Sequence, residues 1–165
     1  MDKKILIIGA GGHGKVVKEV AEACGYKKVD FLDDNSSDAI GKIEELNLYL
    51  NEYENAIVGI GNNLFRNEML DRLKKAGYQI PVLIHPTAYV SPSAIVSEGT
   101  VVEPLAIVNA NSQIYKGCII SVGAIVDHNV VLEECVHVNA GAIVKAGARV
   151  VQNRKLEAGE VVLGY

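Results

Sequence analysis

An aliphatic residue recurs at every sixth position from Val90 to Val150, without an exception. The residue four places after each of them is mostly small, and glycine often precedes that small residue. A β-sandwich, the main alternative for a β-rich chain, does not keep its strands to a fixed interval of six. The aliphatic positions are Val90, Val96, Val102, Val108, Ile114, Ile120, Val126, Leu132, Val138, Val144 and Val150.

This period predicts a parallel β-helix built from hexapeptides. Three hexapeptides form the three sides of one coil of about eighteen residues, and the coils stack about 4.8 Å apart. The aliphatic residue points inward, and the small residue lies near a tight corner where a larger one would clash. A β-helix this short exposes apolar flanks, so we expect it to pack against copies of itself as a cyclic trimer.

The first half of the chain follows a different pattern, in which apolar strands alternate with helical stretches. Such alternation predicts a parallel sheet covered by helices. We therefore expect a small Rossmann-like βαβ domain over residues 1–84, followed by the β-helix over residues 85–165. The expected strands are Lys4–Ile8, Val29–Leu32, Ala56–Ile60 and Gln79–Leu83, and the expected helices are His13–Cys24 and a helix from Asn62 or Asn63 to Ala76.

The stretch GAGGHGKV, residues 9–16, lies between the first strand and the first helix and matches two phosphate-binding patterns. Gly9, Gly11 and Gly14 fit the G-x-G-x-x-G of dinucleotide sites, but a domain of about 80 residues lacks the second half that a dinucleotide fold needs. The stretch also fits the G-x4-G-K of triphosphate sites, but Val16 replaces the hydroxyl that would bind magnesium.

Both patterns share one physical feature, a glycine loop that lets an anion approach a helix N-terminus. A diphosphate on a single nucleoside would suit this half-size domain. Asp33 or Asp34 would then accept hydrogen bonds from the base or the ribose. His13 either contacts phosphate or sugar or only caps the helix, and Lys15 is expected to be solvated.

Three histidines lie in or beside the repeat region. His85 precedes a proline and is expected to shape the turn between the domains. His128 occupies the third place of its hexapeptide, which points outward, so it is either a general base or a plain surface histidine. His137 lies half a coil further on and starts from another face, although neighbouring subunits of a trimer can bring different faces to one groove.

Composition excludes several classes of partner. The net charge is −4, so nothing indicates binding to nucleic acid or to an anionic membrane. The N-terminus lacks the features of a signal peptide, and no apolar run is long enough to span a bilayer. Cys24, Cys118 and Cys135 are an odd number without metal-site spacing, which indicates a cytoplasmic protein without disulfides. We see no ligand set for zinc or magnesium.

Several stretches together resemble the bacterial sugar acetyltransferases of the sialic-acid and bacillosamine pathways. They are GAGGHGKVV at 9–17, FLDDN at 31–35, GIGNN with Arg66 at 59–66, LIHPTAYVSPSA at 83–94, DH at 127–128 and VHVNAGA at 136–142. The resemblance spans nearly the whole chain. It implies a left-handed β-helix, a trimer, an N-terminal domain that binds the acceptor, often a UDP-linked amino sugar, and acetyl-CoA in the groove between neighbouring β-helices.

The resemblance also implies residue roles. In the β-helix, His128 would be the general base, His137 would line the acetyl end of the coenzyme, and the backbone N–H of Ala146, one coil after His128, would donate to the thioester oxygen. In the N-terminal domain, the acceptor would contact Gly11, Gly12 and His13 through its sugar or phosphates, and Asp33 and Asp34 through its base.

The chain departs from the family pattern in two places. Asn129 stands where the family usually has an acidic residue that orients the base, and Asp127 is a poor substitute because strand neighbours point to opposite faces. After Val150 the sequence reads VQNRKLEAGEVVLGY, in which VVLGY resembles the start of the family's coenzyme-covering tail. We therefore expect a short array, and either a reduced coenzyme groove or a sequence that is shortened at its C-terminus.

Three functions follow from this pattern. The first is acetyl transfer from acetyl-CoA to an amine of a nucleotide-linked sugar. Direct attack on the thioester is expected, because no cysteine lies beside either motif histidine and Cys135 is expected near a corner. The second is O-acetylation of a sialic acid or a related sugar by the same residues. The third is a trimeric module that binds a nucleotide sugar without transferring an acyl group, which the short array and Asn129 favour.

Overall fold

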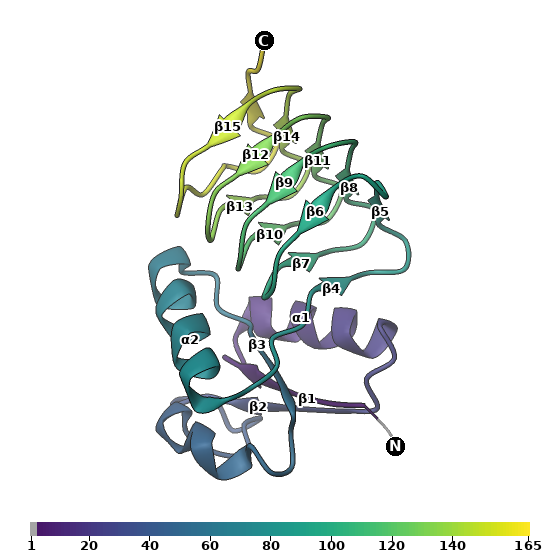
Figure 1. The fold of residues 1–165 in the computed structure, drawn as a ribbon. Helices are drawn as coiled ribbons and strands as arrows, with labels where there is room; N and C mark the ends of the chain where they lie inside the picture. Colours follow the sequence, from purple (N-terminus) through teal and green to yellow (C-terminus); the bar gives the residue numbers. More distant parts are fainter. Residues whose placement is uncertain (1–2) are drawn as a thin grey trace. The chain divides into compact units, whose positions relative to one another are not determined.

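The computed structural model describes residues 3–165 and divides into two compact units, with the division between Pro81 and Val82 (Figure 1). The sequence pattern predicted this boundary after residue 84. Strands and helices alternate in the first unit, and very short strands follow one another in the second. The α/β fold followed by an all-β fold is confirmed.

The first unit is built on a three-stranded parallel sheet in the order β2-β1-β3. The central strand β1 is buried from Ile5 to Ile8, which explains its continuous apolar sequence. Helix α2 begins at an Asn62 cap, whose side chain accepts from the Phe65 N–H, and ends at Gly77 in a left-handed conformation. The elements are β1 (Lys4–Ile8), α1 (Gly12–Ala23), β2 (Lys28–Leu32), the 3-10 helix η1 (Ile43–Tyr49), β3 (Asn55–Val58) and α2 (Asn63–Ala76).

The predicted fourth strand, Gln79–Leu83, is wrong. Gln79 forms only an isolated bridge with Asn55, and Pro81 has no N–H with which to continue the ladder. Leu83 and Ile84 instead form β4, the first strand of the second unit, where they pair with β7. The apolar run was identified correctly but assigned to the wrong sheet.

The second unit is the predicted parallel β-helix. Its two-residue strands form three sheets, in the orders β4-β7-β10-β13, β5-β8-β11-β14-β16 and β6-β9-β12-β15. Paired residues are eighteen apart, as in Ile119 with Val101 and with His137. The strands are β4 (Leu83–Ile84), β5 (Tyr89–Val90), β6 (Ile95–Val96), β7 (Val101–Val102), β8 (Ile107–Val108), β9 (Gln113–Ile114), β10 (Ile119–Ile120), β11 (Ile125–Val126), β12 (Val131–Leu132), β13 (His137–Val138), β14 (Ile143–Val144), β15 (Arg149–Val150) and β16 (Val161–Val162).

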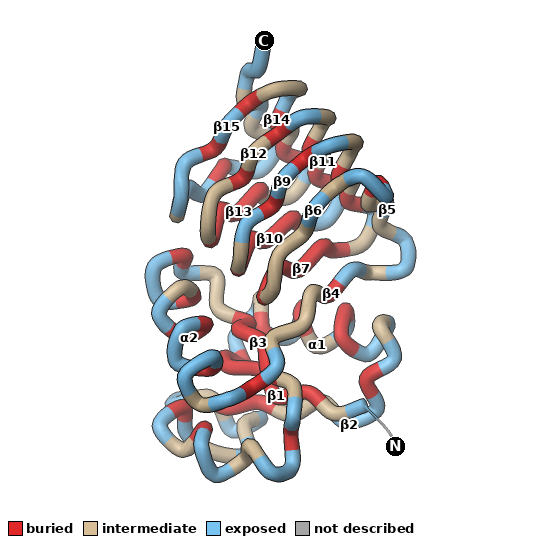
Figure 2. The backbone as a smooth tube through the Cα atoms, viewed as in Figure 1, coloured by how far each residue is buried: buried red, intermediate tan, exposed pale blue. Residues whose placement is uncertain are grey.

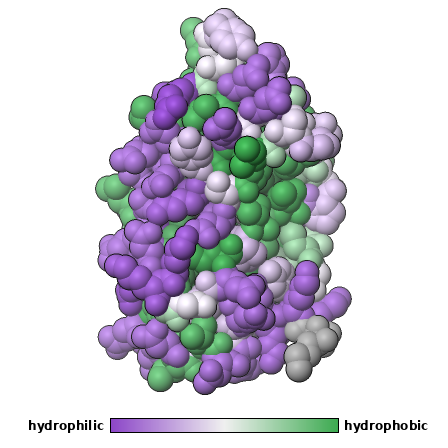
Figure 3. Space-filling view, in the orientation of Figure 1, coloured by the Kyte–Doolittle hydropathy of each residue, from purple (hydrophilic) through white to green (hydrophobic). Residues whose placement is uncertain are grey.

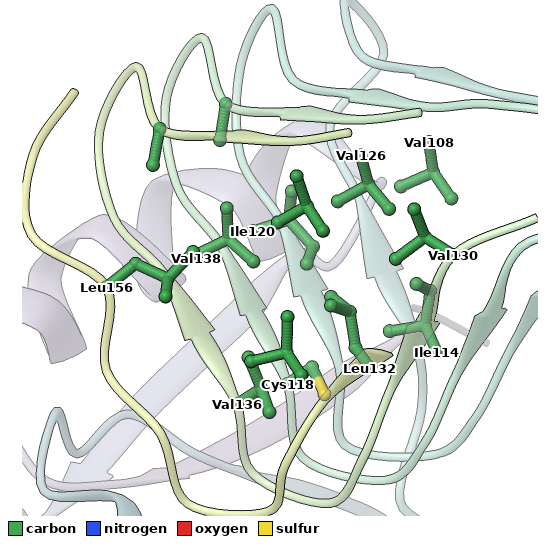
Figure 4. Packing of buried hydrophobic residues seen from close by; sticks show 14 of the residues in the cluster. Val108, Ile114, Cys118, Ile120, Val126, Val130, Leu132, Val136, Val138 and Leu156 are labelled. Atoms are coloured by element: carbon green, nitrogen blue, oxygen red, sulfur yellow. The ribbon is translucent and has the colours of Figure 1, made fainter. Parts of the chain in front are cut away.

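The aliphatic residues of the repeat fill the interior of the coils. Figure 4 shows Val108, Val126 and Val138 among the side chains that share this core, and Figure 2 shows buried positions recurring along every sheet. The row continues beyond Val150 through Leu156, which is fully buried, and Val162, which packs against the core. The array is therefore longer than expected from the sequence, because the polar stretch before Leu156 hid two further repeats.

The corners of the β-helix impose a second period of six. Each corner residue has a positive φ, a left-handed conformation that glycine, asparagine and aspartate tolerate best. Asn129, with a φ of 57°, and Cys135, with a φ of 56°, both occupy such corners, as expected for Cys135. The corner residues are Gly99, Leu105, Asn111, Gly117, Gly123, Asn129, Cys135, Gly141, Gly147, Asn153 and Gly159.

Candidate functional site

In the first unit, the loops after the three strands gather at one edge of the sheet, because carboxyl ends of parallel strands share an edge. These loops contain the glycine stretch after β1, the Asp33–Asp34 pair after β2 and the GIGNN stretch after β3. In folds of this kind, ligands bind at that edge. The sequence-predicted acceptor residues are therefore brought to one place.

Two kinds of glycine occur in the loop after β1. A Cβ on Gly14 would lie 2.1 Å from the carbonyl oxygen of Gly9, so only glycine allows α1 to approach the loop this closely. A Cβ on Gly11 or Gly12 would meet nothing within 4 Å. Gly11 caps α1 without a side-chain hydrogen bond, so no side chain of the cap residue occupies the first helical N–H groups. This part of the loop can receive an anion.

Asp33 supports the glycine loop directly. One carboxylate oxygen accepts from the Ala10 N–H at 2.8 Å, and the other accepts from the Asn35 N–H at 2.8 Å. These two N–H groups lower the pKa of Asp33 below its ordinary value. Asp34 is exposed, and its carboxylate accepts from the Ile43 N–H at 3.0 Å, where η1 begins. Both side chains hold backbone in place, and their contact with a nucleobase stays a prediction.

His13, in the first turn of α1, lies in the electric field of Arg66 of α2. Burial, followed by the guanidinium charge of Arg66, lowers the pKa of His13 to about 4. His13 is therefore neutral at physiological pH. It can exchange a hydrogen bond with a phosphate or a sugar hydroxyl, but it does not bring a positive charge to the loop.

Arg66 was noted in the sequence only as part of a motif. Its side chain is 1% exposed, and its guanidinium donates to the Ile60 carbonyl at 2.9 Å and to the Asn63 side-chain oxygen at 2.7 Å. Arg66 thus fixes the loop after β3 to α2. The sequence did contain a signal that Arg66 is buried. Its helical spacing from Met69 and Leu73 places this charged residue on the buried face of α2.

In the second unit, His128 lies at the corner that follows β11. The carboxylate of Asp127 accepts from the backbone N–H of His128 at 2.7 Å and from the Asn109 amide at 3.1 Å. The first of these bonds is the main reason that the pKa of Asp127 is lowered. Asp127 therefore holds the backbone of the corner and not the imidazole ring.

The imidazole ring is contacted by Asn129. The amide nitrogen of Asn129 lies 3.0 Å from Nδ1 of His128 and 3.2 Å from the phenol oxygen of Tyr165. Sequence reasoning missed Tyr165, for which there was no signal. It also missed Asn109, although the eighteen-residue spacing from Asp127 could have identified it.

The two residues assigned to the coenzyme lie in different places. His137, in β13, is 9% exposed, and its Nε2 lies 2.9 Å from the hydroxyl of Ser121. Ala146 lies one coil after His128, and its backbone N–H contributes to the lowered pKa of Asp127. Ala146 thus belongs to the His128 corner. His137 lies in β13, which belongs to a different sheet from β11, the strand that precedes the His128 corner.

The sheet that leads into the His128 corner carries apolar residues on its outer face. They are the first residues of successive strands, which alternate with the inward aliphatic residues. Figure 3 shows apolar side chains gathered toward the right of the β-helix, whereas its left side is mostly polar. We call this set the outer apolar column: Tyr89, Ile107, Ile125, Ile143 and Val161.

Two further features bear on ligands and membranes. Among the residues that the structure describes, no three His, Cys, Asp or Glu side chains are grouped as a metal site. Nor does any helix within residues 3–165 have the length and apolar character needed to cross a bilayer.

Comparison with known proteins identifies relatives of both units. Residues 4–73 match the family described as the PglD N-terminal domain. A segment of 111 residues, 61% of this chain, is 32% identical to the UDP-N-acetylbacillosamine N-acetyltransferase of Bacillus subtilis (strain 168). That segment spans 51% of the relative's length, so the chain aligns with about half of this protein.

Two groups of solved structures share the fold. The acetyltransferase domain of PglB from Neisseria gonorrhoeae FA1090, in complex with acetyl coenzyme A, has a TM-score of 0.92 and 38% identity, with 98% of this chain and 82% of that chain covered. A mutant of perosamine N-acetyltransferase from Caulobacter crescentus, in complex with CoA and GDP-perosamine, has a TM-score of 0.85 and 28% identity, with 98% and 89% covered. The expected fold class, a Rossmann-like domain followed by a left-handed β-helix, is confirmed.

Proposed function

This chain belongs to the sugar acetyltransferases that include the PglB acetyltransferase domain, and from that membership we propose that it acetylates an amine of a nucleotide-linked amino sugar. Acetyl-CoA is the proposed acetyl donor. Relatives named as N-acetyltransferases of UDP- and GDP-linked sugars support an amine acceptor over the hydroxyl of a sialic acid. The additional repeats through Val162 weaken the argument for a module that binds without catalysis.

The observation that carries this proposal is the His128 corner. His128 is partly exposed, its backbone is held by Asp127, and its Nδ1 faces the Asn129 amide, so Nε2 is the nitrogen left for substrate. His128 takes a proton from the acceptor amine as that nitrogen forms a bond to the thioester carbonyl carbon. The carbon–sulfur bond then breaks, and His128 returns the proton to the leaving thiolate.

Other residues have proposed roles within each unit taken by itself. His137 lines the acetyl end of the coenzyme, and the Ala146 N–H is shared between the Asp127 carboxylate and the thioester oxygen. In the first unit, the open loop at Gly11 and Gly12 receives the diphosphate of the acceptor, and neutral His13 donates or accepts one hydrogen bond there. Asp33 and Asp34 position the loops around the nucleoside.

The test is a thiol-release assay with acetyl-CoA and a panel of acceptors. The panel contains UDP-linked amino sugars, a GDP-linked amino sugar and free sialic acid. Turnover with a nucleotide-linked amino sugar is expected, and turnover with sialic acid alone would replace the proposal by O-acetylation. Calorimetric heat with a nucleotide sugar, without thiol release from any acceptor, would instead identify a binding module.

We also propose that the chain forms a homotrimer through the outer apolar column. Tyr89 and Val161, at its two ends, are 54% and 50% exposed, which is unfavourable for large apolar side chains in water. In a trimer, this face of one β-helix would pack against a sister chain. The seam would form the groove for the coenzyme.

Replacing Ile107 with glutamate is expected to dissociate the trimer and abolish acetyl transfer. Ile107 points outward from β8, so the change places a charge in the proposed seam without altering the core. Light scattering after size-exclusion chromatography measures the mass. The control is Leu48→Glu, at an exposed apolar position in the first unit, which is expected to stay trimeric. An Ile107→Glu protein with an unchanged mass would refute this interface.

Finally, we propose a cytoplasmic location. Cys24, Cys118 and Cys135 are an odd number and lack the spacing of a disulfide framework, which suits a reducing compartment. The proposed co-substrate, acetyl-CoA, is available there.

A further inference from the structure

Three side chains form a chain of contacts at the His128 corner. Nδ1 of His128 lies 3.0 Å from the amide nitrogen of Asn129, and that nitrogen lies 3.2 Å from the phenol oxygen of Tyr165. The carboxylate of Asp127 is occupied by the His128 N–H and the Asn109 amide. The Asn129 amide is therefore the group that decides how the imidazole is hydrogen-bonded at Nδ1.

Tyr165 is held in place although its side chain is largely exposed. Strand β16 pairs with β14, so the segment that follows it runs beside Ala146 and Gly147. A Cβ on Gly164 would lie 1.8 Å from the Ala146 carbonyl oxygen, and a Cβ on Gly147 would lie 1.8 Å from the ring of Tyr165. The Tyr165 N–H donates to the Ala146 carbonyl at 3.3 Å. Two glycines thus allow the phenol to reach Asn129.

The orientation of the amide determines which ring nitrogen carries the proton. When the amide nitrogen of Asn129 faces Nδ1, it donates, so the single proton of neutral His128 must lie on Nε2. In that form Nε2 cannot take a proton from a substrate. A half turn about the Cβ–Cγ bond places the amide oxygen at the same point, where it accepts from Nδ1–H and leaves Nε2 free to act as a base.

We propose that Asn129 and Tyr165 are positioning residues that select the base-competent tautomer of His128. This inference rests on the proposed function, in which His128 is the base. A phenol is a better donor than acceptor, so the hydroxyl of Tyr165 favours the amide orientation that turns its oxygen inward. The amide oxygen then accepts from both Tyr165 and Nδ1–H. The pair does the work that the family usually assigns to an acidic residue after the base.

The test is the tautomer ratio of His128, measured by NMR of the full chain labelled with ¹⁵N-histidine, without substrate, at a pH where the imidazole is neutral. His85 is an internal reference, because its Nδ1 accepts from the Thr87 N–H and its proton must therefore lie on Nε2. Tyr165→Phe is expected to lower the ratio of Nδ1–H to Nε2–H about fivefold, the effect of one hydrogen bond of ordinary strength. Tyr115→Phe, at another exposed tyrosine of the β-helix, is the control.

Asn129→Asp is the complementary variant. Aspartate also tolerates the left-handed corner, and its carboxylate can only accept, so His128 is expected to become almost entirely the Nδ1–H tautomer. A ratio that does not change in Tyr165→Phe overturns the role of the phenol. An Asn129→Asp protein that keeps the Nε2–H tautomer overturns the role of the amide.

Kinetics separate this inference from the proposed function. Tyr165→Phe is expected to lower kcat by at most about fivefold, in proportion to the fraction of the Nδ1–H tautomer, with an unchanged KM for the nucleotide sugar, and Asn129→Asp is expected to raise kcat. If the wild-type chain transfers no acetyl group but the NMR ratios shift as expected, the proposed function fails and the tautomer selection stands. If transfer occurs and neither variant changes kcat or the ratio, the tautomer selection fails alone.

Discussion

A His128→Ala protein is expected to lose acetyl transfer by a factor of about 10² to 10⁴ in kcat. The acceptor amine must lose a proton as it attacks the thioester, and the neighbouring groups cannot replace the imidazole. The Asp127 carboxylate already accepts hydrogen bonds, from the His128 N–H and the Asn109 amide among others, and has a lowered pKa, and the Asn129 amide is not a base. Thiol release at saturating acetyl-CoA measures kcat directly.

The substitution is suited to this test because it spares the corner. The backbone N–H of residue 128 still donates to Asp127, so the fold around the site is expected to persist. His85→Ala removes another histidine of the second unit, whose ring bonds Thr87, and is expected to keep its turnover. Full turnover by His128→Ala would eliminate the general-base role.

A Gly14→Ala protein is expected to lose about 3 kcal/mol of stability in the first unit. The added Cβ would lie 2.1 Å from the Gly9 carbonyl oxygen and 2.9 Å from the Gly9 carbonyl carbon, both of which are backbone atoms. Gly9 has little freedom to move, because it has a φ of 101° and its N–H donates to Leu32. Urea unfolding followed by helical circular dichroism reports on this unit, which contains both α-helices of the described chain.

Gly12→Ala is the matched control, two residues earlier in the same helix. Its added Cβ meets nothing within 4 Å, and alanine is the better helix former, so the unfolding midpoint is expected to stay equal or to rise slightly. The methyl group would nevertheless occupy the open space proposed for the diphosphate. We expect calorimetry to show weaker binding of the nucleotide sugar, by about tenfold. Equal destabilisation by both variants would contradict the steric explanation.

Much of the fold could be predicted because a few residues are subject to simple constraints. Each inward side chain of the β-helix fills a fixed core, so Val108 and Val126 recur at the period that the geometry sets. The strand predicted over Gln79–Leu83 was assigned to the wrong sheet because a short apolar segment does not reveal which strands it pairs with. Leu156 was missed because the intervening segment is polar and exposed, although its spacing was correct.

The site was less predictable than the fold. The histidines and acidic residues could be located in the sequence, but the partner of each one could not. Asp127 was weighed as a partner of the His128 ring, yet it bonds to the backbone, and Asn129 reaches the ring because a left-handed corner turns it there. The contact of Tyr165 with Asn129 spans 36 residues and depends on two glycines, which no local pattern reveals.

The pairing of residues eighteen apart restricts how proteins of this kind can change in length. An insertion or deletion within a coil that is not a multiple of six would turn inward side chains to the outside in every later coil and move each left-handed corner onto a residue unsuited to it. A change of six or twelve residues would keep the inward rows and the corners but would move every later residue to another side of the β-helix, so only steps of eighteen codons also keep the same residues on the same face.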